Sequence, residues 1–83
     1  MQETYSVIYY SADDFYGFRN MYFQINERRK ASNFAKLMSK RLDNVKHYPS
    51  HIYKNKWYYN PDGSFHSVES TLVATYIDGY KKR

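Results

Sequence analysis

The sequence predicts one α+β domain, residues 1–83, in which a small antiparallel sheet of three to four strands packs against one amphipathic basic helix. The chain has 83 residues, a length that suits one domain burying only roughly 60% of its unfolded surface. β-Branched and aromatic residues dominate segments 4–11 and 51–59, as in strands. Apolar residues between them recur at helical spacing over about residues 27–44. A βαββα order is the alternative.

Aromatic side chains must supply much of the core. Isoleucine, leucine and valine together number 11, whereas Phe, Trp and Tyr number 17. The eleven tyrosine hydroxyls each need water or a hydrogen-bond partner, so a core of this size cannot hold them all. We therefore expect exposed rings, and a homodimer that covers them.

The N-terminal third contains one clear strand and one ambiguous segment. Residues 4–11 read as a strand. Within segment 13–26, Met21, Phe23 and Ile25 alternate with polar or hydroxyl-bearing residues, which favours a second strand. Phe15 and Phe18 also begin a helical spacing, so a helix that starts near residue 13 is the alternative interpretation of this segment.

The helix at about residues 27–44 is predicted from one apolar stripe. Its members fall on one side of a helical wheel: Ala31, Phe34, Ala35, Met38, Leu42 and Val45. Asn26 or Ser32 could cap the start of this helix, and residues 43–44 could end it.

A hairpin is predicted from residue 51 onward. Residues 51–59 form the first strand, residues 60–63 (Asn-Pro-Asp-Gly) suit a type I turn, and the chain then returns as a second strand. Alternation sends Trp57 to one side of the strand and Lys54, Lys56 and Tyr58 to the other. We expect the Trp57 side to face the core. Residues 70–79 fit either a helix or a strand.

Positive charge is concentrated in the middle of the chain. The formal net charge is +5, and residues 28–56 hold nine of the thirteen Lys and Arg residues with a single acid, Asp43. A surface helix usually mixes both signs through i, i+4 pairs. A concentrated basic patch instead suggests a polyanion as the partner. The residues expected to bind nucleic acid, either RNA or single-stranded DNA, are Arg29, Asn33, Lys36, Lys40, Arg41, Lys54, Lys56 and Tyr58.

No enzyme, cofactor or metal site is predicted. His47 and His51 have the i, i+4 spacing of helical metal ligands, but Pro49 between them opposes helical geometry. The chain has no cysteine, no long apolar run and no signal-peptide pattern at its N-terminus. These features predict a cytoplasmic protein with no membrane partner.

In size and composition the chain resembles the small, cysteine-free, lysine- and tyrosine-rich accessory proteins of large tailed phages, which act in host takeover or counter-defence. That resemblance implies an inhibitor or adaptor that binds a host protein, such as a ribonuclease toxin, a polymerase or a defence nuclease, in some cases together with RNA. The residues themselves favour a non-enzymatic nucleic-acid-binding protein, with RNA preferred over DNA because exposed tyrosines suit unstacked bases. Nucleic-acid binding and inhibition of a host protein are thus the two hypotheses for this sequence.

Overall fold

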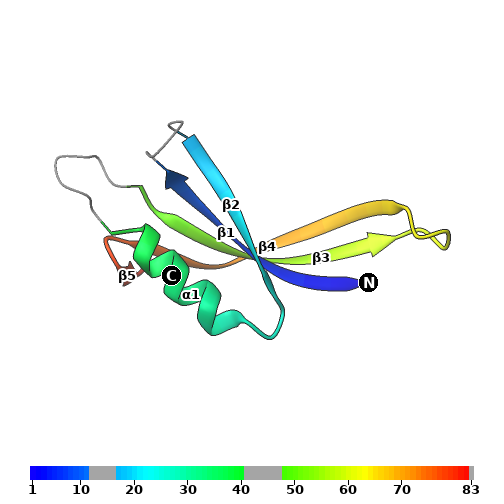
Figure 1. Cartoon of the computed structure of the whole chain (residues 1–83), viewed down its shortest axis with the longest axis horizontal. Coiled ribbons are helices and arrows are strands. Elements are labelled where there is room, and N and C mark those ends of the chain that lie inside the picture. Colours follow the sequence, from blue (N-terminus) through cyan, green and yellow to red (C-terminus); the bar gives the residue numbers. More distant parts are fainter. Residues whose placement is uncertain (12–16, 41–47, 83) are drawn as a thin grey trace.

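The computed structural model describes residues 1–11, 17–40 and 48–82, which form one sheet and one helix (Figure 1). The elements in chain order are β1 (Gln2–Ser11), β2 (Gly17–Gln24), α1 (Arg28–Met38), β3 (Ser50–Tyr59), β4 (Phe65–Ile77) and β5 (Tyr80–Lys81). The sheet is antiparallel with the order β2-β1-β3-β4-β5. The predicted α+β class is confirmed, although the sheet has five strands rather than three to four.

The two ambiguous segments are both strands where the structure describes them. β2 runs antiparallel to β1 in an unbroken register from Thr4 opposite Gln24 to Ser11 opposite Gly17. The tail continues β4 as far as Ile77, so the βαββα alternative is not observed in the described residues. None of these residues belongs to a helix long and apolar enough to span a membrane.

The core forms where α1 packs on one side of the sheet. Val7 of β1 and Ile52 of β3 lie opposite each other in the register, and both are fully buried. Ala31 and Ala35 face them from the helix, and their small side chains let α1 approach the sheet closely. The apolar stripe is confirmed over its described part, from Ala31 to Met38. Its last members, Leu42 and Val45, lie outside the described residues.

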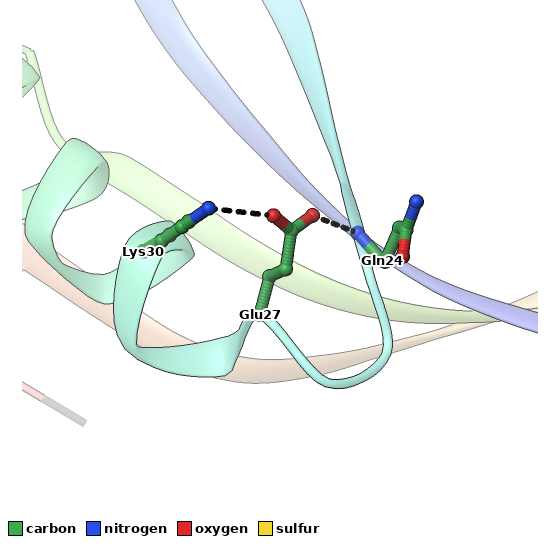
Figure 2. Close-up of polar contacts among 3 residues, drawn as sticks. All are labelled: Gln24, Glu27 and Lys30. Carbon is green, nitrogen blue, oxygen red and sulfur yellow. Dashed lines mark hydrogen bonds and ion pairs between the residues drawn. The ribbon is translucent and has the colours of Figure 1, made fainter.

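The start of α1 is fixed by Glu27 (Figure 2). Gln24 donates its backbone N–H to Glu27 Oε1 at 2.8 Å, and the Lys30 ammonium lies 3.0 Å from Glu27 Oε2. Together these contacts lower the pKa of the Glu27 carboxyl, the backbone hydrogen bond more than the lysine. The N-cap is Glu27 rather than the predicted Asn26 or Ser32.

The helix ends at Met38 because Ser39 joins it to the turn between β4 and β5. Asp78 donates its backbone N–H to the Ser39 carbonyl at 2.9 Å, and Gly79 donates its own to Ser39 Oγ at 3.0 Å. The predicted helix extended to residue 44, a boundary that ignores this long-range contact. Asp78 and Gly79 both have positive φ, the backbone of a two-residue hairpin turn that Asp-Gly sequences favour.

The predicted hairpin of β3 and β4 is confirmed. Its turn closes with a hydrogen bond from Gly63 N–H to the Asn60 carbonyl at 2.9 Å. Asp62 Oδ1 accepts from both the backbone N–H and the hydroxyl of Ser64, which lowers the pKa of the Asp62 carboxyl.

The prediction of which β3 face is buried was wrong. Alternation does separate Trp57 from Lys54 and Lys56, but α1 packs on the side of Ile52, which is also the lysine side. The lysines stay accessible because α1 covers only part of the sheet. The molecule is 50 Å long, whereas a helix of 11 residues is only about 16 Å long. Figure 1 shows the outer part of the β3–β4 hairpin extending well past α1. Trp57 therefore lies on the side that the helix leaves open.

Ile52 lies at the centre of the contact between α1 and the sheet, so shortening its side chain tests how α1 packs. We expect Ile52→Ala to lower the free energy of unfolding by about 2–5 kcal/mol, because a buried side chain is replaced by a cavity. Leu37→Ala is the control, since Leu37 is an exposed apolar residue of α1. This substitution should change the free energy of unfolding by less than about 0.5 kcal/mol. Denaturant unfolding measures both. Equal effects would show that α1 does not pack on Ile52.

The Glu27 contacts predict a pH effect whose sign is fixed. A carboxyl whose pKa is lowered by folding stabilises the native state at neutral pH, and this stabilisation is lost as pH falls through the folded-state pKa. In Lys30→Gln the pKa of Glu27 should rise but stay below its ordinary value, because the stronger cause, the Gln24 N–H, remains. Titration of the side-chain carboxyl by NMR measures this. An unchanged pKa would mean that the ion pair does not form in solution.

Candidate functional site

Four polar side chains form an exposed stripe along α1 and just beyond it. This stripe, the basic helix face, consists of Arg29, Asn33, Lys36 and Lys40. All four are exposed, and the helical rotation places them opposite the buried Ala31 and Ala35. Lys40 follows the end of the helix, and its Cγ and Cε lie 3.4 and 3.5 Å from the position that a Cβ on Gly79 would take. The stem of Lys40 is thus supported by the β4–β5 turn.

The cations on the helix side of the sheet differ in whether an acid balances them. Lys30 pairs with Glu27 at 3.0 Å, and Lys54 pairs with Glu3 at 3.2 Å. Lys56 lies between Glu3 and Glu69 in the register of neighbouring strands. Arg28 lies over the ring of Tyr5, 5.7 Å from its centroid.

By contrast, the cations of the basic helix face have no such balance. Within the described ranges, neither Arg29, Lys36 nor Lys40 has a carboxylate within ion-pair distance. Among the described residues these three are therefore exposed cations without an acidic partner, as are Arg19 of β2 and Arg28 at the start of α1.

The predicted hairpin residues lie on the same side of the sheet as α1. Lys54, Lys56 and Tyr58 point to this side and are each half-buried. The structure thus places them on the side of the basic helix face, but with acidic neighbours that the helix lacks. Arg41, the remaining predicted site residue, lies outside the described residues.

The opposite side of the sheet carries a surface that the sequence analysis had assigned to the core. We call it the open face. Its members are the side chains that alternate away from the helix: Gln2, Thr4, Ser6, Ile8, Tyr10, Phe18, Asn20, Tyr22, Gln24, His51, Tyr53, Asn55, Trp57, Tyr59, Phe65, Val68, Ser70, Leu72 and Thr75; none of them is Asp, Glu, Lys or Arg. Of these, Phe18, Tyr22, Tyr59, Phe65 and Val68 are exposed, and Trp57 is half-buried.

The polar groups in the middle of the open face bond to one another. Asn55 donates to Ser6 Oγ at 3.1 Å and accepts from the Ser70 hydroxyl at 2.7 Å. Trp57 donates its indole N–H to Thr4 Oγ1 at 2.8 Å. Above this network lies an open groove of about 320 Å³, lined among others by Tyr22, Trp57 and Val68. In the groove floor Asn55 and the Trp57 indole N–H bond to hydroxyls of the same chain, and the walls are aromatic and aliphatic.

The two histidines that the structure describes, His51 and His66, lie at opposite ends of the β3–β4 ladder. His51 Nδ1 lies 2.9 Å from Thr75 Oγ1, which accounts for its position in the sheet. His66 is exposed at the irregular end of the β3–β4 ladder, and His47 lies outside the described residues. In the described part of the chain, His, Asp and Glu form no group of three or more that could hold a metal ion.

The site therefore consists of two surfaces on opposite sides of one sheet, a basic helix face and an uncharged aromatic open face. Comparison of the chain with protein-family models, with curated proteins and with solved structures found no match.

Proposed function

We propose that the protein is a non-enzymatic nucleic-acid-binding protein that contacts phosphates through its basic helix face, and that it binds RNA in preference to DNA. The observation that carries this proposal is the set of three exposed cations, Arg29, Lys36 and Lys40, for which the described residues supply no acidic partner. Arg29 and Lys36 are seven residue steps apart, or about 10 Å at the helical rise of 1.5 Å per residue, and Lys40 lies two residues beyond the last residue of α1. A backbone strand that runs along α1 could meet all three.

The start of α1 supports the same proposal. The helix dipole favours acids in the first turn, yet α1 begins with Arg28, Arg29 and Lys30 and has no acid in that turn. Glu27 offsets Lys30 alone. The sequence thus accepts an unfavourable charge arrangement at this helix end, and phosphate groups would relieve it.

The preference for RNA depends on a half-buried ring on the helix side of the outer hairpin. Tyr58 lies on the helix side with Lys56, and unstacked bases of a single strand can pack against such rings. The inhibitor or adaptor hypothesis remains the alternative, in which an acidic protein surface would occupy the basic helix face.

Salt dependence and a charge-matched pair of variants test the proposal. On single-stranded RNA, the log of the binding constant should fall with log salt at a slope near −0.7 per neutralised phosphate. Replacing Arg29, Lys36 and Lys40 together by glutamine should weaken binding across sequences and flatten that slope by about two. Fluorescence anisotropy at several salt concentrations measures the slope, with duplex DNA as the comparison.

The control variant removes the same charge from cations that already have acidic neighbours, namely Lys30, Lys54 and Lys56, each changed to glutamine. It should bind more tightly than the Arg29, Lys36 and Lys40 variant and keep most of the slope. Equal weakening by the two variants would mean that net charge alone attracts the ligand. A parent protein that binds neither RNA nor DNA at moderate salt would exclude the proposal and favour an acidic protein partner.

A further inference from the structure

The open face differs from the usual exposed side of an antiparallel sheet. Such a side is normally polar, with apolar residues reserved for the side that meets the core. Here large apolar side chains remain exposed on both sides of the groove, including Phe18 and Tyr22 from β2 and Phe65 and Val68 from β4. Several exposed apolar side chains on one face of a small domain indicate an interaction site.

The open face also carries no formal charge among its described members. Every charged residue of β1 to β4 that the structure describes, namely Glu3, Arg19, Lys54, Lys56 and Glu69, takes a register position on the helix side. Phosphates would therefore gain no neutralisation on the open face, which argues against a polyanion there. An uncharged, aromatic surface suits a partner of the same character.

The polar centre of the open face can be covered without losing hydrogen bonds. Asn55 and the Trp57 indole N–H already bond to Ser6, Ser70 and Thr4 within the same chain. Burying a polar group is costly chiefly when it leaves that group without a partner. The satisfied centre thus permits a dry contact, whereas reading of bases would require free donors and acceptors.

We propose that a second copy of this chain packs on the open face, forming a twofold dimer of two sheets with the α1 helices outside. A copy is the occupant that matches the face in chemistry, because a twofold contact pairs the surface with itself. Each chain has a net charge of +5, but in this dimer the cations of β1 to β4 face away from the contact, because they lie on the helix side of each sheet. The inference does not depend on the proposed nucleic-acid function.

The size of the face agrees with this occupant. The ten-residue strands β1 and β3 are each about 33 Å long, and four strands about 4.8 Å apart cover about 19 Å, so the outline of the open face is on the order of 600 Å², comparable to the area of about 800 Å² that each partner buries in a standard interface. Two sheets packed face to face lie about 10 Å apart with side chains interdigitating between them. The groove between Tyr22, Trp57 and Val68 offers space for protruding side chains of the partner.

Sedimentation equilibrium across the micromolar range tests the dimer. The wild-type protein should show twice the chain mass of 10.1 kDa. Tyr22→Lys and Val68→Lys each place a charge on the open face and should raise the dimer dissociation constant by about tenfold or more. Met21→Lys is the matched control, since Met21 neighbours Tyr22 on β2, is 40% exposed like Val68, and points to the helix side. It should leave the dissociation constant within about threefold, or roughly 0.6 kcal/mol. Circular dichroism confirms that each variant folds.

Three results would overturn the inference. A wild-type monomer throughout the range would exclude the dimer. If that monomer also showed quenching of Trp57 fluorescence by single-stranded RNA, the open face would be assigned to base stacking instead. Loss of the dimer in Tyr22→Lys and Met21→Lys but not in Val68→Lys would place the contact at the exposed edge of β2. Concentration-dependent protection of Trp57 from acrylamide, together with the expected order of the variants, would support the face-to-face dimer.

Discussion

The packing of α1 against the paired side chains of Val7 and Ile52 determines the rest of the structure. Both residues are fully buried, and two alanines of the helix lie against them. Because side chains alternate along every strand, this contact decides at once which side of each strand is covered and which is left open. The placement of the lysines, of Trp57 and of the groove all follow from it.

The same contact explains how a strand can carry Lys54 and Lys56 on the side that also forms the core. α1 covers the sheet around Val7 and Ile52, and the outer part of the hairpin lies beyond it (Figure 1). There the lysines meet Glu3 and Glu69 instead of the helix. In the described residues Lys54 and Lys56 therefore have acidic neighbours on adjacent strands, whereas on α1 an acid pairs with Lys30 alone.

The sequence was sufficient for β1, the β3–β4 hairpin turn and the described part of the apolar stripe, because each depends on residues close together in the chain, whereas it left β2 and the end of β4 open between helix and strand. It failed where distant residues decide. The helix end depends on Ser39 meeting Asp78 and Gly79, and the buried side of β3 depends on the orientation of a helix that precedes it. The Trp57 side was expected to face the core because the lysines of β3 alternate to the other side, whereas Ile52 on that lysine side in fact fills the core. One local signal was overlooked, since Asp78-Gly79 is a favoured hairpin dipeptide and indicates a strand on either side. The exposed positions of Arg29, Asn33 and Lys36 on α1 agree with the sequence because helical periodicity fixes them without any tertiary information.

The two proposed surfaces constrain each other through the thickness of the sheet. In a face-to-face dimer the layers would follow the order helix, sheet, sheet, helix, with neighbouring layers about 10 Å apart, so the two basic helix faces would point in opposite directions roughly 30 Å or more apart. One short strand lying along α1 could not reach the second helix, so the two sites would bind short ligands independently. A longer strand that passes around the edge of the sheets could engage both sites, and the second contact would then gain from the high local concentration that the first creates. The dimer would thus favour long nucleic acid over short fragments. This selectivity needs no additional base contact, because it arises from the distance between the two basic helix faces.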